Sequence, residues 1–242
     1  MSEEIQEKIL MIEGPAQGTV LVDGKEVLIS TNNSKDDIDI VDDGAHNTGV
    51  STWDASYELS KFFIRNKDLI RNKNIMELGS GTGLVGITIG LLKPHVNKIL
   101  LTDLQYTQSQ IEKSIKLNNL EERAKFHVLD WNNFSTIPSL ISDSSTAPNS
   151  NPNHPYPTGN NINNVNNEDD IDFVVLADCV WLLHLVKPLV RTIKQINRPF
   201  FMAHQTRSTE VDALLFSLLE VKFDITMVEQ QGKIKIYQGE MR

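Results

Sequence analysis

A glycine-rich segment at residues 77–83, Glu-Leu-Gly-Ser-Gly-Thr-Gly, carries the clearest chemical signal in the sequence. It continues a short apolar run at residues 75–78 that is typical of a buried strand. Glycines after a strand allow a tight turn and let a ligand approach the main chain closely. Asp103 ends the next apolar run, twenty residues after Gly83, and a carboxylate there can accept hydrogen bonds from both hydroxyls of a ribose. The pattern therefore predicts a nucleoside-binding site.

The glycine spacing alone leaves two nucleoside cofactors open. Gly81, Gly83 and Gly86 also spell the G-x-G-x-x-G pattern of dinucleotide sites. The distance from these glycines to Asp103 suits NAD equally well. The loop by itself therefore indicates a nucleoside cofactor without saying which one.

Three further features favour S-adenosyl-L-methionine over NAD. Glu77 precedes the first glycine by two residues, where a dinucleotide site needs no acid. Asp130 and Trp131 end the third predicted strand of the sheet. They offer an acceptor for an adenine amino group and an indole that can stack on the ring. The chain also has one alternating half and a terminal antiparallel pair, which is typical of a seven-stranded methyltransferase sheet rather than a doubled dinucleotide fold.

The same segments resemble the lysine methyltransferase family 16, seven-β-strand enzymes that use S-adenosylmethionine. The resemblance lies in residues 53–56, 77–86, 101–103, 130–131, 177–181 and 236–239. It extends from about residue 49 to residue 242, apart from an Asn-rich insert. Members of the family methylate mostly lysines of non-histone proteins, including chaperones and translation factors. The resemblance thus implies a protein-lysine N-methyltransferase whose partner is a protein substrate of that type.

The resemblance also implies roles at the cofactor. Trp53 would lie over the methionine end, the backbone of residues 79–83 would wrap that end, and Glu77 would order the loop or reach the cofactor's amino group. Asp103 would bind the ribose, and residues 130–131 would hold the adenine. The implied cofactor-binding set is Trp53, Glu77, Gly79, Ser80, Gly81, Gly83, Asp103, Leu104, Asp130, Trp131 and Ala177.

An Asp-x-x-Tyr motif faces the acceptor lysine in this family. Here it reads Asp-Cys-Val-Trp at residues 178–181, so the aromatic position is kept but the hydroxyl is lost. By resemblance, Asp178 would orient the amine or relay its proton. Trp181 would bind the cationic product through the face of its ring. We expect these two residues to be the catalytic ones.

The altered motif leaves other functions open. One is a methyltransferase of the same fold that acts on a small amine or on another side chain. Another is a catalytically lapsed relative that binds the cofactor and serves as an interaction module. The intact Gly79, Gly81, Gly83, Asp103 and Asp178 argue against the lapsed relative. An NAD dehydrogenase is disfavoured because no second cofactor half and no Tyr-Lys or His pair is visible.

Strand and helix patterns alternate along the chain and must position these residues. Strands are predicted at residues 75–78, 99–102, 126–129, 173–177 and 200–203, and helices at 53–65, 84–92, 107–118, 185–196 and 209–219. A hairpin is predicted at residues 19–29, turning at 23–24. Strands at 223–228 and 234–238 lie too close for a helical crossover and must pair antiparallel. We predict an α/β fold: a Rossmann-like class I methyltransferase sheet of seven strands, mostly parallel, with helices on both faces.

Two segments depart from the globular pattern. Residues 31–44 are rich in Asp and Asn, and nine of the nineteen residues at 149–167 are Asn. Such composition cannot bury enough apolar surface to offset its ordering entropy, so we predict disorder for an insert at about 136–169. We divide the chain into an N-terminal hairpin with an acidic loop, residues 1–48, and a methyltransferase domain, residues 49–242.

Acidic side chains outnumber basic ones by 32 to 23 among the 242 residues, giving a formal net charge of −9. This excess argues against a long basic stripe for nucleic acid and suits a basic protein or peptide as partner. Cys179, the single cysteine, excludes an internal disulfide, and we predict a small buried residue there and no metal site. Apolar runs stay short of the roughly 18–20 residues that span a bilayer, and the acidic N-terminus lacks a secretory pattern. We expect a cytoplasmic monomer with neither nucleic acid nor membrane as partner.

Overall fold

The computed structural model describes residues 17–30, 52–133 and 170–242. The predicted acidic loop and Asn-rich insert lie outside these described residues. The strands are β1 Gln17–Val22, β2 Lys25–Ser30, β3 Lys73–Leu78, β4 Val96–Asp103, β5 Ala124–Val128, β6 Phe173–Ala177, β7 Phe200–Gln205, β8 Phe223–Gln231 and β9 Ile234–Met241. The helices are α1 Asp54–Arg65, α2 Leu84–Leu91, α3 Gln108–Leu117, α4 Leu183–Ile196 and α5 Thr209–Leu219, with 3-10 turns at Lys67–Ile70 and Gln105–Thr107.

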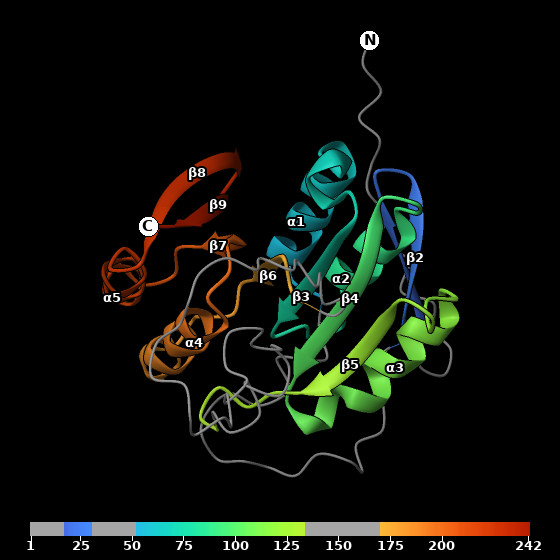
Figure 1. Ribbon diagram of the computed structural model, residues 1–242, viewed down its shortest axis with the longest axis horizontal. Helices are drawn as coiled ribbons and strands as arrows, with labels where there is room; N and C mark the ends of the chain where they lie inside the picture. Colours follow the sequence, from blue (N-terminus) through green and yellow to red (C-terminus); the bar gives the residue numbers. More distant parts are fainter. Residues whose placement is uncertain (1–16, 31–51, 134–169) are drawn as a thin grey trace, which may run out of the picture.

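Seven of these strands form one sheet in the order β5-β4-β3-β6-β7-β9-β8 (Figure 1). The strands from β5 to β7 in this order pair in parallel, whereas β9 pairs antiparallel with both β7 and β8. The predicted fold class is therefore confirmed. The chain moves outward from β3 to β5 and then returns to β6 on the other side of β3. Such a switch point opens a crevice at the carboxyl ends of the two strands, where ligands of open α/β sheets bind.

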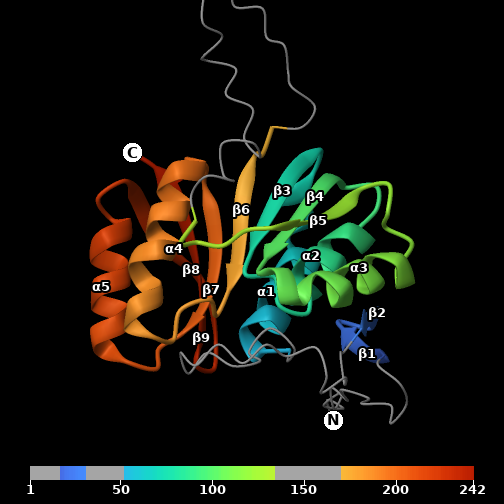
Figure 2. The same cartoon turned by 90° about the horizontal axis from the view of Figure 1, so that it is seen from below.

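Helices cover both faces of the sheet, as Figure 2 shows. The helices α1, α2 and α3 share one apolar cluster with one face, and α4 and α5 share a second cluster with the other. The strand β6 explains how one sheet serves both clusters. Phe173 and Val175 belong to the first cluster, and Val174 and Leu176 belong to the second. Successive side chains point to opposite faces of a strand, so a strand buried on both sides is apolar throughout.

The N-terminal hairpin turns at residues 23–24, as predicted, and both residues have a positive φ. Its apolar side chains belong to the same cluster as α1–α3: Val20, Val22, Val27 and Ile29. The side chain of Asn118, at the end of α3, accepts a hydrogen bond from the Leu28 N–H at 3.1 Å and donates one to the Leu28 carbonyl at 2.7 Å. The hairpin therefore packs on the outside of α3 (Figure 2). The division of the chain at residue 48 stays a prediction.

Each predicted element occurs in the described structure, with small shifts at its ends. Trp53 is the N-cap of α1 rather than its first helical residue. The strand β4 begins at Val96, before the predicted residue 99, because its first residues pair with β3 across an irregular register. That pairing involves polar positions, which an apolar pattern does not mark. In the part of the chain that the structure describes, no helix is long and apolar enough to cross a membrane.

Candidate active site

The glycine loop after β3 requires glycine for its backbone conformation. Gly79, Gly81 and Gly83 have φ of +62°, +54° and +78°, in the left-handed region that side chains disfavour. Space is also restricted at Gly79, where an added Cβ would lie 2.9 Å from the Sγ of Cys179 and 3.1 Å from the ring of Trp131. A side chain at Gly79 would therefore meet both backbone strain and close contacts.

Asp103 holds the glycine loop from the end of β4. One of its carboxylate oxygens accepts a hydrogen bond from the Gly81 N–H, and the other accepts one from the Leu104 N–H, both at 2.7 Å. Burial raises the pKa of Asp103 to about 6, although both N–H donors favour the charged form. Ser80 adds a second link, because its N–H donates to the Thr102 carbonyl and its Oγ accepts from the Thr102 N–H, both at 3.0 Å. The loop is thus fixed to β4 at the sheet edge.

Glu77 lies beneath the loop and is only 3% exposed. Its Oε2 accepts a hydrogen bond from the Gly86 N–H at 3.0 Å, in the first turn of α2. Burial raises the pKa of Glu77 to about 8, so its carboxyl is largely neutral at pH 7. An added Cβ at Gly86 would lie 2.6 Å from this oxygen. Of the two roles predicted for Glu77, this geometry favours ordering the loop.

The two residues predicted to hold adenine follow β5. Asp130 accepts a hydrogen bond from the Asn132 N–H at 2.8 Å, which shapes the turn that presents Trp131. The half-buried indole of Trp131 lies against Gly79 and packs on the apolar cluster of α4 and α5. Trp131 therefore lies beside the glycine loop in the folded chain, although the two are far apart in sequence.

Asp178 follows β6 with φ of +50°, a conformation that is uncommon for residues other than glycine. Its Oδ2 accepts a hydrogen bond from Nη2 of Arg207. Its Oδ1 is buried and has no hydrogen-bond partner among the residues that the structure describes. Burial raises the pKa of Asp178, and the positive charge of Arg207 opposes that rise most strongly. A strained backbone and an unpaired buried carboxylate oxygen together mark a candidate functional residue.

Arg207 was not predicted as a site residue. Its guanidinium carbon lies 5.1 Å from the ring centroid of Trp53, which is 39% exposed at the start of α1. Two predicted site residues, Trp53 and Asp178, are thus joined through a residue from a third segment. A signal for it did exist in the sequence. Arg207 closely follows the fifth predicted strand of the sheet, and the carboxyl ends of parallel strands meet at one edge.

Cys179, which follows β6, contacts the glycine loop that follows β3 at the carboxyl end of the sheet. Its Sγ donates to the Leu78 carbonyl at 3.2 Å, and it is buried against Gly79. Burial raises the pKa of this thiol well above its ordinary value, and the Asp103 carboxylate raises it further. The prediction of a small buried residue is confirmed, since such a thiol is unreactive.

The remaining predicted site residues lie at the same edge. Ala177 is the last residue of β6, and Leu104 follows β4 with an exposed side chain. Trp181 is half-buried in the segment between β6 and α4. The structure gives these three residues a place at the carboxyl edge, and their roles stay predictions.

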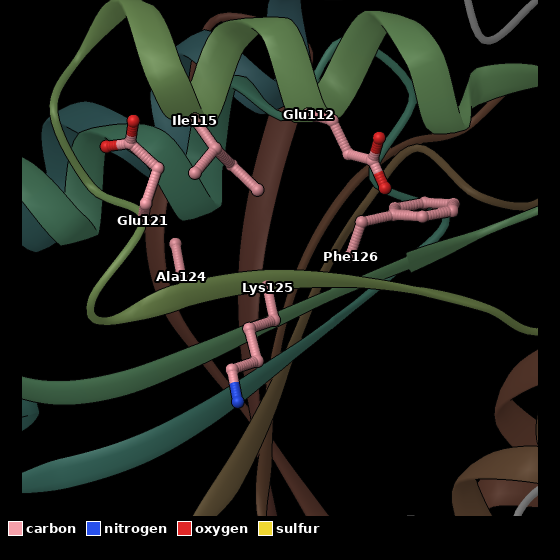
Figure 3. A pocket seen from close by; sticks show the side chains of 6 residues that line it. All are labelled: Glu112, Ile115, Glu121, Ala124, Lys125 and Phe126. Carbon is pink, nitrogen blue, oxygen red and sulfur yellow. The ribbon is translucent and has the colours of Figure 1, made fainter.

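A pocket lies elsewhere, between α3 and β5 (Figure 3). Its lining residues are Glu112, Ile115, Glu121, Ala124, Lys125 and Phe126. In Figure 3 the side chains of Glu112 and Ile115 extend from α3 towards β5, whereas Lys125 points away from the helix. None of these lining residues belongs to the predicted site, so this pocket has no part in it.

Comparisons with known proteins agree with the predicted resemblance. Residues 32–143 match the model of a family described as lysine methyltransferase. The EEF1A lysine methyltransferase 3 of Xenopus tropicalis is 43% identical over 74 residues, which cover 30% of this chain and 32% of that protein. The protein-lysine N-methyltransferase EFM6 of Saccharomyces cerevisiae is 27% identical over 176 residues, which cover 69% of this chain and 63% of that protein. The chain thus spans less than two thirds of the length of these curated relatives.

The fold also has a counterpart among solved structures. The 16S rRNA methyltransferase RsmC of T. thermophilus, solved with AdoMet and guanosine, matches with a TM-score of 0.57 and 13% identity. The match covers 93% of this chain and 50% of that one. At such identity the likeness concerns the fold alone, and it agrees with the predicted sheet. The chain is thus similar to the lysine methyltransferase family over residues 32–143, where the family model matches.

Proposed function

We propose that this chain is an S-adenosyl-L-methionine-dependent methyltransferase that modifies the side-chain amine of lysine in a non-histone protein. One observation carries the proposal: a loop of left-handed glycines bonded to Asp103 stands beside Asp178, whose Oδ1 is buried and unpaired among the described residues. The two features meet at the switch point between β3 and β6, where Leu78 pairs with Leu176. The family match supports the same reaction.

The residues at the β3–β4 edge fit the cofactor. Glycines leave the main chain of the loop accessible to the methionine end. Asp103 is largely ionised at pH 7, and each of its oxygens keeps a lone pair for a ribose hydroxyl beside the backbone bond it already accepts. We place the adenine at residues 130–131 and Trp53 over the methionine end. The bound cofactor supplies the methyl group as a sulfonium.

The acceptor lysine must lose a proton before its amine can attack. Its ordinary pKa is about 10.4, so it arrives as a cation at neutral pH. The Oδ1 of Asp178 has no partner among the described residues, so it can accept a hydrogen bond from that ammonium, fix its direction and take up one of its protons, which solvent then removes. Trp181 offers a ring face for the cationic product. Because a neutral thioether leaves when the methyl–sulfur bond breaks, no acid is needed, and positioning supplies much of the acceleration.

The proposed substrate is a basic segment of an elongation factor. The excess of acidic residues suits a lysine-rich partner, and one relative is named for EEF1A. A cytoplasmic location, a monomeric state and a domain boundary near residue 48 are parts of the same proposal. They do not bear on the chemistry of the site.

A labelled-methyl assay tests this function. The purified chain is incubated with methyl-labelled cofactor and elongation factor 1A, and mass spectrometry locates the label. We expect label on one lysine, and none on a substrate variant in which arginine replaces that lysine. In parallel reactions the acceptor is total RNA or a pool of small amines. Label in either of those reactions, with none on protein, would contradict a protein-lysine methyltransferase.

A further inference from the structure

Arg207 lies between two residues of the candidate site. Its Nη2 donates to Oδ2 of Asp178, and its guanidinium carbon lies 5.1 Å from the ring centroid of Trp53. We propose that Arg207 is a positioning residue that bonds Asp178 while it stacks on Trp53, an arrangement of three residues that we call the clasp. It keeps the Asp178 carboxylate charged and leaves Oδ1 to the acceptor amine. This inference rests on the proposed function, because it assigns Asp178 to the acceptor.

The side chain of Asp178 is only 3% exposed, and burial disfavours its charged form, so a nearby positive charge is needed to keep the carboxylate ionised. Burial raises the pKa of Asp178, and Arg207 is the strongest of the groups that lower it. His204 of β7, whose Nε2 is hydrogen-bonded to Asp212 of α5 at 2.8 Å, lowers it less, and so does the backbone N–H of Gln205. Asp54 of α1 acts in the opposite direction. Without Arg207, burial would therefore favour a neutral carboxyl that cannot take a proton from lysine.

The geometry of the clasp also sets which oxygen is free. Arg207 engages Oδ2 and leaves Oδ1 without a partner among the described residues. Trp53 covers the guanidinium, and a planar guanidinium can stack on an indole while it donates to a carboxylate. A lysine at position 207 keeps the charge but has no planar group to stack. We therefore expect the positive charge and the planar shape of Arg207 to contribute separately to catalytic activity.

The first test compares pH profiles of kcat/KM for wild type, Arg207→Gln and Arg207→Lys. Removing an adjacent opposite charge should shift the acidic limb upward by about 1–3 pH units. At pH values below both acidic limbs, kcat/KM of Arg207→Gln should therefore be about tenfold or more lower than that of wild type, and the difference should shrink as pH rises. Arg207→Lys should lie between the two. Arg242→Gln is the matched control, since Arg242 forms an exposed pair with Asp224 away from the site, and its profile should equal that of wild type.

A loss of equal size at every pH would overturn the inference, because it would indicate a merely structural role. An unchanged profile would overturn it as well.

The second test needs no substrate. Thermal unfolding is measured at pH 5 and pH 8 for wild type, Arg207→Gln, Asp178→Asn and the double variant. A buried carboxyl without its Arg207 partner has a higher pKa in the folded chain than in the unfolded chain. The free energy of unfolding of the protein therefore falls as pH rises towards that folded-state pKa. Arg207→Gln should therefore lower Tm more at pH 8 than at pH 5. In the Asp178→Asn background this difference between the two pH values should vanish.

If Arg207→Gln lowers Tm by the same amount at pH 5 and at pH 8, the inference is wrong, even if the wild-type chain is an active enzyme. A pH-dependent deficit that persists in the double variant, where no carboxyl remains at position 178, would overturn it too. A wild-type chain that transfers no methyl group would contradict the proposed function alone, because the unfolding test still reports on the pair.

Discussion

The two parts of the carboxyl edge are built differently. At the β3–β4 part, Asp103 has both oxygens bonded to backbone N–H groups, and the Ser80 side chain is bonded to β4. At the β6–β7 part, Asp178 has one oxygen on the side chain of Arg207, which is 33% exposed, and the other unpaired among the described residues. The first part is complete before a ligand arrives. The second has a buried carboxylate oxygen that no described residue bonds.

In the proposed function, the β3–β4 part binds the cofactor and the β6–β7 part holds the group that reacts with the acceptor. A site held by backbone bonds keeps its geometry, as a cofactor that is replaced after every turnover requires. A carboxylate held by one side chain can respond to an arriving cation. Substitutions in the two parts should therefore separate cofactor binding from methyl transfer.

The largest effect is expected at Asp178. Asp178→Ala removes the carboxylate that we propose faces the acceptor, so methyl transfer should fall by about 100-fold or more. Binding of S-adenosylhomocysteine should stay close to wild type, because the β3–β4 part is untouched. Transfer rates and calorimetric titration measure the two effects. If Asp178→Ala still transfers methyl groups at the wild-type rate, Asp178 has no role in the mechanism. If the variant no longer binds S-adenosylhomocysteine, the two parts do not have separate functions.

A steric change at the loop should come next. Gly79→Ala combines a positive φ with contacts of 2.9 Å and 3.1 Å, so it should lower the free energy of unfolding by about 2–4 kcal/mol. Gly232→Ala is the matched control, because Gly232 has φ of +54° but nothing within 4 Å of an added Cβ. It should cost only about 1 kcal/mol. Urea unfolding measures both, and equal losses would mean that the contacts at Gly79 are unimportant.

The neutral state of Glu77 gives a pH-dependent prediction. Its pKa is raised from 4.5 to about 8 in the folded chain, so the folded state holds a proton that the unfolded state releases. Wild-type stability should therefore fall as pH rises between these values, by about 1 kcal/mol per pH unit from this group. Glu77→Gln mimics the neutral carboxyl and should flatten that dependence. Unfolding free energies at pH 6 and pH 8 measure the difference, and parallel curves would refute the neutral Glu77.

The smallest effect concerns the ribose carboxylate. Burial raises the pKa of Asp103 to about 6, and we propose that its charged form accepts the ribose hydroxyls, so cofactor affinity should weaken as pH falls through that value. Asp103→Asn should bind S-adenosylhomocysteine about tenfold more weakly at pH 7.5, as expected for lost hydrogen bonds to a charged group. Its affinity should also vary little between pH 5 and pH 7.5. A pH series of calorimetric titrations would show whether Asp103 is the titrating group.

Local patterns in the sequence predicted the fold and the place of the glycine loop and Asp103 within it, while the roles of these residues stay predictions. The glycine loop, Asp103 and their strands lie within a short stretch whose spacing has a direct structural meaning. Cross-strand pairing at the start of β4 was not predicted because polar residues carry it. Local periodicity marks apolar faces and turns, and it therefore finds elements better than their exact ends.

The β6–β7 part was predicted only as single residues. Asp178 and Trp53 were identified, but Arg207 joins them from a third segment, and no spacing rule links such positions. The neutral state of Glu77 likewise depends on burial by distant elements. Contact between Trp131 and Gly79 is a third case, since β4 and α3 separate them along the chain. Interactions between distant segments need the folded structure.

Calorimetric titration of the purified chain with S-adenosylhomocysteine, and in parallel with NAD, is the sharpest test of the proposed cofactor site. We expect stoichiometric binding of S-adenosylhomocysteine and no heat from NAD. Binding of NAD alone would mean that Gly81, Gly83 and Gly86 serve a dinucleotide, and binding of neither would contradict a cofactor site at the β3–β4 edge.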